Sequence, residues 1–121
     1  MLIFLRDFYN QFYPDIQNKF NIKLDSSAGL GLPNSSGVYI CIEIDRITEV
    51  ASVVYVGSSK NIAKRIYTTK HKLTEHIFKY RNEEISYTFV YFLTDEYLKL
   101  EKQLIFYLKP RLNTNGKNKL L

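Results

Sequence analysis

Two stretches of β-branched residues constrain the fold of this chain most strongly. From Val38 to Asp45 every second residue is Val or Ile, which is the period of a strand with one apolar face. A second β-branched run, residues 51–56, follows a short polar stretch. An antiparallel hairpin is the simplest interpretation of the two runs.

The register of this hairpin decides where Tyr39 and Tyr55 point. If the connecting loop holds three or five residues, directly paired positions differ by an even number, and both tyrosines project from the same face. A loop with an even number of residues, or a β-bulge, would separate them.

The remaining segments complete an α+β pattern. The aromatic and aliphatic residues of segment 5–16 have helical spacing, with a break or restart at Pro14, and residues 25–36 have loop composition. Further helices are predicted at 62–69 with Asn61 as N-cap, around 73–80, and from the acidic turn after Thr94 to near Pro110, with a third strand at 85–93. The sequence predicts a small antiparallel three-stranded sheet flanked by helices, with an extra N-terminal helical segment.

Charge is distributed unevenly along the 121 residues. Residues 1–59 hold four Lys and Arg and six Asp and Glu, net −2, whereas residues 60–121 hold thirteen and six, net +7. A basic half of this kind predicts a polyanion as partner. The lone Cys41 excludes an internal disulfide and a Cys-based zinc site. No apolar run is long enough to span a bilayer, so no membrane partner and a cytoplasmic or host-cell interior are expected.

One acidic residue lies in an unfavourable place. Glu101 falls in the middle of the apolar stripe of the last predicted helix. A carboxylate on the core side of a helix needs a partner, because its desolvation is costly. Two partners fit: a buried salt bridge to Arg65 or a nearby Lys, or a Mg²⁺ ion. The helix alone does not choose between them.

Several short motifs follow one another in a distinctive order. They are Gly37-Val38-Tyr39, Tyr55-Val56-Gly57, Asn61, Arg65, Glu101 and Lys109-Pro110-Arg111-Leu112-Asn113. In this order, over about residues 32–113, the chain resembles the GIY-YIG nuclease family. Each motif is weak when taken alone, and the order carries the resemblance.

The resemblance implies a role for each matching residue. Glu101 would bind a single divalent metal, Mg²⁺ or Mn²⁺. Tyr39 would be the general base or water-positioning group, with Tyr55 as neighbour and alternative base. Arg65 would stabilise charge on the phosphoryl oxygens, and Asn113 would be a buttress. The implied activity is metal-dependent DNA endonuclease cleavage, by in-line hydrolysis with one metal ion.

The family pattern is not complete. A His or Tyr usually stands four residues after the Arg, where this chain has Thr69, and His71 follows two residues later. His71 would reach the site only if the helix ends before it. Ser58 and Lys60 are further accessory candidates beside His71 and Asn113.

A domain this small needs DNA affinity from its surface. The predicted DNA-contacting cations are Lys60, Lys64, Lys70, Lys72, Lys109 and Arg111. The expected substrate is duplex or branched DNA, with specificity supplied by a homodimer or a partner protein. Residues 1–31 are expected to be a helical extension and loop that packs on the core, 32–113 the nuclease domain and 114–121 a basic tail.

Two other functions fit the sequence. The first is a non-catalytic nucleic-acid-binding module that stacks bases on Ile85, Tyr87, Phe89 and Tyr91, which share one face of the third strand. We expect the N-terminal or last helix to cover that face, which would remove the stacking surface. The second is a degenerate nuclease fold retained for protein contacts.

Overall fold

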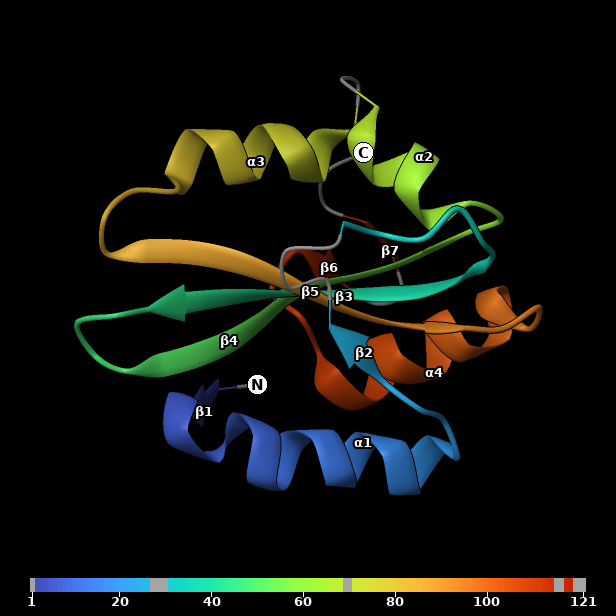
Figure 1. Ribbon diagram of the computed structural model, residues 1–121, viewed down its shortest axis with the longest axis horizontal. Coiled ribbons are helices and arrows are strands. Elements are labelled where there is room, and N and C mark those ends of the chain that lie inside the picture. The colour runs from blue at the N-terminus through green and yellow to red at the C-terminus, as the bar shows by residue number, and fades with distance from the viewer. Residues whose placement is uncertain (1, 27–30, 69–70, 115–116, 119–121) are drawn as a thin grey trace.

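The protein has three layers, with a curled sheet between two layers of helices (Figure 1). The computed structural model describes residues 2–26, 31–68, 71–114 and 117–118. Helices α2 (Ile62–Tyr67) and α3 (Lys72–Tyr80) lie over one face of the sheet, and α1 (Tyr13–Phe20) and α4 (Tyr97–Leu108) lie over the other. The predicted fold class is confirmed.

The sheet is antiparallel throughout, with strand order β1-β4-β3-β5-β2. The three predicted strands form its centre: β3 (Gly37–Asp45), β4 (Val50–Ser59) and β5 (Ile85–Leu93). Two short edge strands, β1 (Leu2–Phe4) and β2 (Asp25–Ser26), were not predicted. Both come from the N-terminal segment, so this segment extends the sheet as well as covering it.

The N-terminal helical segment changes its winding along its length. A 3₁₀ turn (Leu5–Asp7) leads into a π-helical turn (Phe8–Phe12) and then into α1. The backbone N–H of Tyr13 donates to the carbonyl of Phe8, five residues back. Pro14 follows at the start of α1 and has no N–H to offer, which explains the predicted break at this position.

The last helix begins later than its acidic residues predict. The Thr94 hydroxyl accepts a hydrogen bond from the backbone N–H of Glu96, but α4 starts at Tyr97. Asp95 and Glu96 therefore precede its first turn. Beyond α4, a small hairpin pairs β6 (Asn113–Thr114) with β7 (Lys117–Asn118).

The β3–β4 hairpin has both an even-numbered loop and a β-bulge, the two features that were expected to separate Tyr39 from Tyr55. Asp45 pairs with Val50, so the loop holds four residues, and the register shifts once, between Cys41 and Ile42, leaving Val54 as the extra residue. Each of these features alone would move Tyr55 to the other face of the sheet, and together their effects cancel. Tyr39 pairs with Gly57 and Cys41 with Tyr55, so Tyr39 and Tyr55 lie diagonally on one face.

Two hydrophobic cores share the sheet. Val38, Ile40 and Ile42 face α1 and α4, together with Val90 and Phe92 from β5. Tyr39, Cys41 and Tyr55 face α2 and α3. We expected the N-terminal or last helix to cover the aromatic face of β5, and this is wrong. Tyr87, Phe89 and Tyr91 lie partly buried on the α2–α3 side, because the opposite face of β5 supplies the larger core.

The outer edge of β4 is covered in two pieces. Strand β1 pairs with residues 50–52. Further along, the N–H of Leu112 donates to the Val54 carbonyl at 3.0 Å. The side chain of Asn113 then accepts from the N–H of Val56 at 3.0 Å and donates to its carbonyl at 3.2 Å. The segment after α4 thus substitutes for a neighbouring strand.

No helix in the described parts of the chain is long and apolar enough to cross a bilayer.

Gly37 lies where a side chain has no room. A Cβ at this position would overlap the Phe92 carbonyl oxygen and would meet Ile62 at 3.0 Å. We expect Gly37→Ala to lower the free energy of unfolding by about 1–3 kcal/mol, because β5 and α2 would both have to move away from β3 to make room for the methyl group. Urea unfolding measures this, with Ser52→Ala on β4 as the control. Equal unfolding midpoints for the two variants would contradict the prediction.

Candidate active site

Tyr39 and Tyr55 form the centre of the candidate site. Their ring centroids are 6.2 Å apart, and both side chains are buried. The ring of Tyr39 lies across Gly57, where an added Cβ would overlap the ring and its hydroxyl. Gly57 therefore lets the Tyr39 ring pass over β4, a role that the sequence alone did not assign.

His71 contacts Tyr39 directly. Helix α2 ends at Tyr67, which meets the condition set by the sequence, and His71 becomes the N-cap of α3. Its Nδ1 accepts from the N–H of Leu73 at 3.1 Å, and its Nε2 lies 3.1 Å from the Tyr39 hydroxyl. Nδ1 therefore carries no proton in the neutral ring, and Nε2–H donates to Tyr39. Thr69 lies outside the described residues.

The Tyr39 hydroxyl is the junction of several polar contacts. Arg65, which is exposed on α2, places a positive charge near this hydroxyl and acts to lower its pKa against the effect of burial. The hydroxyl in turn hydrogen-bonds to Tyr55. The Tyr39 hydroxyl therefore lies among His71, Arg65 and Tyr55.

Glu101 approaches the same region from α4. Its carboxylate is half-buried, and Oε2 accepts a hydrogen bond from the Ser58 hydroxyl at 3.0 Å. Its charge acts on both Tyr39 and Tyr55. Among the described residues no Lys, Arg or His forms a salt bridge with Glu101, so the salt-bridge alternative is not what the structure shows. Its partner is a hydroxyl.

The electrostatics of the site keep both phenols protonated. Burial raises the pKa of Tyr55 to about 12, helped by Glu101 and opposed by Arg65. Burial raises the pKa of Tyr39 further, helped by Tyr55 and again opposed by Arg65. Burial also raises the pKa of Glu101, against the weaker effect of the Ser58 hydrogen bond. Burial and Arg65 lower the pKa of His71 to about 4, so it is neutral at pH 7.

Asn113, for which the resemblance implies a supporting role, contacts the strand that carries Tyr55. It is buried, and both of its hydrogen bonds described above go to the backbone of Val56, next to Tyr55. These contacts hold β4 at Val56. Lys60 follows β4 directly and is exposed.

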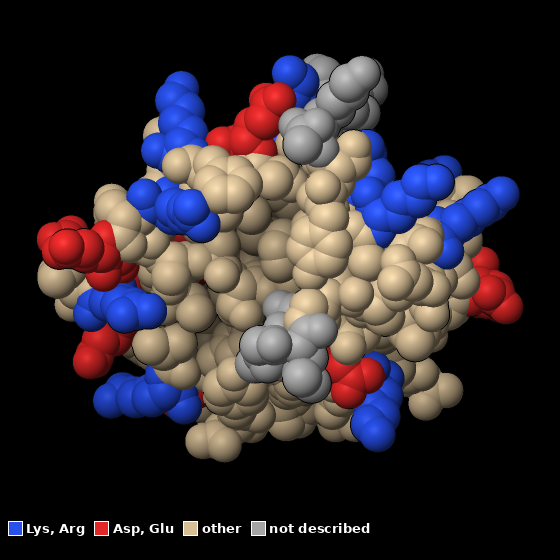
Figure 2. Space-filling view, turned by 45° about the horizontal axis from the view of Figure 1, so that its top comes forward, with Lys and Arg blue, Asp and Glu red and all other residues tan. Residues whose placement is uncertain are grey.

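The predicted DNA-contacting cations differ in their surroundings. Lys60, Lys64 and Lys109 are exposed, and none of them has a carboxylate within 4.0 Å among the described residues. Lys72 pairs with Glu75 at 3.6 Å, and Arg111 pairs with Glu43 at 2.7 Å. Lys70 lies outside the described residues. Figure 2 shows Lys and Arg side chains, with Asp and Glu side chains between them, around the rim of the face that carries α2 and α3, and a largely uncharged hollow inside this rim.

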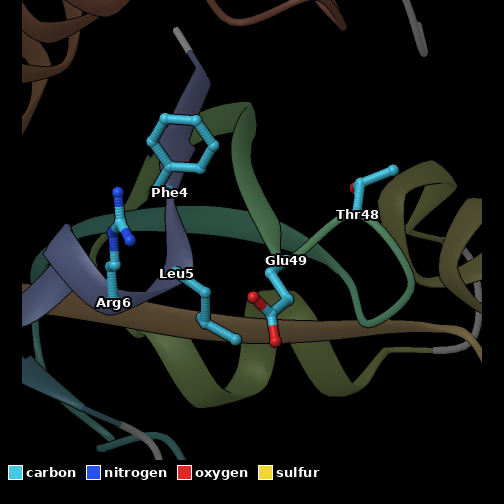
Figure 3. A pocket seen from close by; sticks show the side chains of 5 residues that line it. All are labelled: Phe4, Leu5, Arg6, Thr48 and Glu49. Atoms are coloured by element: carbon cyan, nitrogen blue, oxygen red, sulfur yellow. The ribbon is translucent and has the colours of Figure 1, made fainter.

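The hairpin tip, residues 46–49, contacts the N-terminal segment of the protein itself. The N–H of Leu5 donates to the carbonyl of Glu49 at 2.8 Å. A cavity of about 370 Å³ lies here, lined by Phe4, Leu5, Arg6, Thr48 and Glu49 (Figure 3). Thr48 and Glu49 lie at the opposite end of the hairpin from Tyr39 and Gly57, so the cavity is not part of the candidate site.

The described residues contain no group of three or more His, Cys, Asp or Glu side chains that could hold a metal ion together. A metal at this site would have one protein carboxylate, Glu101. Its second oxygen, Oε1, accepts no hydrogen bond in the described parts of the chain. One carboxylate, with water and substrate phosphate as the other ligands, is a donor set that Mg²⁺ uses.

The model of one known family matches most of the chain. The GIY-YIG catalytic domain matches residues 35–118 of the chain. The protein belongs to the GIY-YIG family. This is a family of nuclease domains, so the chain carries a nuclease fold. No curated protein and no solved structure matches the chain. The predicted domain boundaries at 31 and 113 stay a prediction.

The His71 environment generates a prediction for acid stability. Its pKa is about 4 in the folded protein, below the ordinary value of 6.5, so the unfolded chain binds more protons between these pH values. Stability from this group is therefore complete above pH 6.5 and is lost as the pH falls towards 4.

We expect His71→Asn, which keeps an N-cap side chain, to change this pH dependence. Between pH 7.5 and 4.5 the variant should lose roughly 2 to 3 kcal/mol less of its free energy of unfolding than the parent protein. Urea unfolding at both pH values measures the difference. His76→Gln serves as the comparison, because His76 is less buried. An unchanged pH dependence in His71→Asn would contradict the buried neutral imidazole.

Proposed function

We propose that this GIY-YIG protein is a divalent-metal-dependent DNA endonuclease that hydrolyses phosphodiester bonds in line, with one metal ion. The observation that carries the proposal is the gathering of Tyr39, Tyr55, His71, Arg65 and Glu101 around the Gly57–Ser58 end of β4. These side chains come from five separate elements or connections. Core packing alone does not require them to converge.

Glu101 is the residue that would hold the metal. It is half-buried, its Oε2 accepts a hydrogen bond from Ser58, and its charge acts on the two tyrosines. A bound Mg²⁺ or Mn²⁺ would supply positive charge at the scissile phosphate and the leaving oxygen. The raised pKa of Glu101 makes this binding sensitive to acid, because the protonated carboxyl is a poor ligand.

Tyr39 is best suited to position the attacking water. Its raised pKa keeps the phenol protonated at neutral pH in the protein alone, and the contact with His71 Nε2 fixes the place of its oxygen. To act as the general base, Tyr39 or Tyr55 would need more positive charge than Arg65 provides. Of the two, Tyr55 has the smaller shift, so it is the easier phenol to deprotonate.

Arg65 would bind the phosphate group of the substrate. Its guanidinium is exposed, yet its charge reaches Tyr39, Tyr55 and His71. A donor at the mouth of a buried polar site can contact the phosphoryl oxygens of a substrate and stabilise the charge that grows there. Lys60 and Lys64 on the same side would add salt-sensitive attraction to the DNA backbone.

A non-catalytic nucleic-acid-binding module is the second candidate. The partly buried aromatic residues on the α2–α3 side of β5 favour it. However, Phe89 packs against Tyr39 at 6.3 Å and the Tyr87 hydroxyl donates to Glu43, so these rings already have partners within the protein. The structure gives bases little free ring surface there, and the nuclease proposal is the stronger.

Cleavage of supercoiled plasmid and branched DNA with Mg²⁺ or Mn²⁺ tests the proposal. We expect Glu101→Gln to lower the cleavage rate by at least about 100-fold while DNA binding survives, because the isosteric amide keeps the shape but cannot hold the cation. Tyr39→Phe should also lose cleavage. The parent rate should fall as the pH drops towards the raised pKa of Glu101.

Three outcomes would count against this. Equal nicking by the parent and both variants would assign the activity to a contaminant. Loss of DNA binding by Glu101→Gln would argue against a metal role. Binding without cleavage by the parent, with either metal ion, would favour the non-catalytic module.

Arg65 generates a separate prediction. Because the residue is exposed and no carboxylate pairs with it in the described chain, Arg65→Ala should leave the melting temperature nearly unchanged. The cleavage rate should fall about 100-fold or more. Lys64→Ala, which removes the neighbouring exposed cation, should act on DNA affinity instead. A large fall in melting temperature for Arg65→Ala would show that its role is structural.

A further inference from the structure

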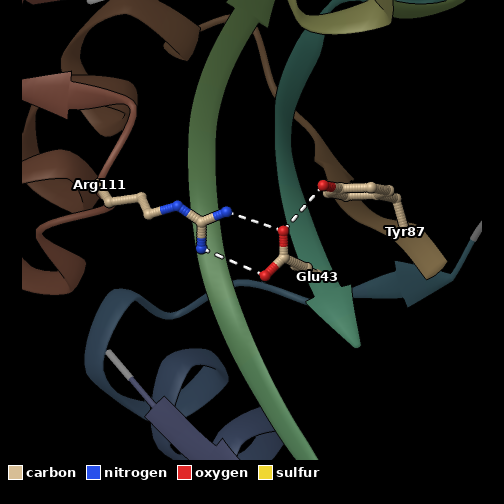
Figure 4. Close-up of polar contacts among 3 residues, drawn as sticks. All are labelled: Glu43, Tyr87 and Arg111. Carbon is tan, nitrogen blue, oxygen red and sulfur yellow. Dashed lines mark hydrogen bonds and ion pairs between the residues drawn. The ribbon is translucent and has the colours of Figure 1, made fainter. Parts of the chain in front are cut away.

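Arg111, predicted as a DNA contact, is bound within the protein. Its two terminal nitrogens donate to the two carboxylate oxygens of Glu43 on β3, at 3.3 and 2.7 Å. The Tyr87 hydroxyl on β5 donates to Glu43 as well, at 2.8 Å (Figure 4). Although burial alone would raise the pKa of Glu43, these hydrogen bonds and the Arg111 charge hold it below its ordinary value. Glu43 is therefore ionised and fully engaged at neutral pH.

The three residues 111–113 fasten one segment of chain to the sheet. Arg111 binds a side chain of β3, Leu112 donates to the Val54 carbonyl, and Asn113 binds both backbone groups of Val56. Val54 is the extra residue of the bulge. The segment therefore contacts β4 at the bulge and again two residues beyond it.

The bulge needs an outside partner. A bulged residue leaves the ladder on its own strand pair, and its backbone groups must be satisfied elsewhere. Here the N–H of Leu112 donates a hydrogen bond to the Val54 carbonyl. If residues 111–113 moved away, β4 would lose its outer partners at Val54 and Val56, which flank Tyr55. The orientation of Tyr55 towards Tyr39 would lose its support.

We propose that the Arg111–Glu43 pair positions the catalytic tyrosines by locking residues 111–113 onto the bulge of β4; this rests on the proposed nuclease function. Glu43 lies four residues along β3 from Tyr39, about 13 Å at the rise of a strand. The pair therefore acts on the site through the backbone. Arg111 is a positioning residue, and Lys109 is left as the DNA-facing cation of this segment.

The two interpretations of Arg111 make opposite predictions for Glu43→Gln. If Arg111 contacts DNA, removing the Glu43 charge frees the guanidinium, and the KM for DNA should fall. If Arg111 positions the site, Glu43→Gln should lower kcat about tenfold with KM unchanged, and Arg111→Gln should do the same. The double variant should be no slower than either single variant, because both break one interaction.

Lys109→Gln provides the matched comparison. It removes the same charge two residues earlier in the chain, from an exposed side chain without a salt bridge in the described residues. We expect it to raise the KM for DNA. Arg111→Lys, which keeps the charge but cannot form the two-pronged contact, should recover part of the lost kcat.

Hydrogen exchange gives a readout that does not depend on cleavage. The Val56 N–H, bonded to Asn113, should exchange at least about tenfold faster in Arg111→Gln, whereas amides of the β3–β5 ladder should keep the parent rates. The nuclear Overhauser contact between the Tyr39 and Tyr55 rings should weaken in the same variant.

Each result decides the matter. A lower KM in Glu43→Gln, additive losses in the double variant, or a Val56 amide as protected as in the parent would overturn the positioning role. If the parent cleaves no DNA, the nuclease proposal fails, and the exchange and ring-contact measurements still judge whether the pair holds the bulge.

Discussion

The one-residue bulge at Val54 is the constraint on which the candidate site depends. A four-residue hairpin loop alone would put Tyr55 on the face opposite Tyr39, against the core formed with α1 and α4. The extra residue reverses the parity halfway along the hairpin. Val53 and Val56 then face one core while Val54 and Tyr55 face the other. The same hairpin can thus supply an apolar face to the main core and two phenols to a polar site.

The site that results is held together at a cost in solvation. Two phenols, an imidazole and a carboxyl are taken partly or fully out of water, and burial is the largest cause of the pKa shift of each. In each case the charged form is the one disfavoured. Arg65 opposes this for both tyrosines, and its own charge stays exposed to solvent. A site that disfavours charge in this way gives a large electrostatic response to a bound cation or phosphate.

Much of this could be predicted from local patterns, and the rest depended on longer contacts. The period of β3 predicts its buried face, and the polar environment of Glu101 follows from its place in an apolar stripe. The contact between His71 and Tyr39 was not predictable, because it requires α2 to end at Tyr67, and no Gly or Pro marks that end. The bulge has no sequence signature here either, since Val53 and Val54 are identical residues. The β5 faces were assigned wrongly because Tyr and Phe alternate with Thr and Val, and both faces offer apolar surface.

The distribution of cations bears on where the proposed DNA substrate would approach. In the sequence, the second half of the chain has a uniform basic character. In the folded protein, two of its cations form salt bridges with carboxylates of the same chain. Arg111 is held by Glu43 and Lys72 is paired with Glu75, whereas Lys60, Lys64 and Arg65 follow one another on and just before α2 without such partners in the described residues. Phosphate attraction depends on charges that are free to replace counterions, and these three residues offer such charges next to one another. One of the three is the guanidinium whose charge acts on Tyr39, so this group of cations borders the candidate site.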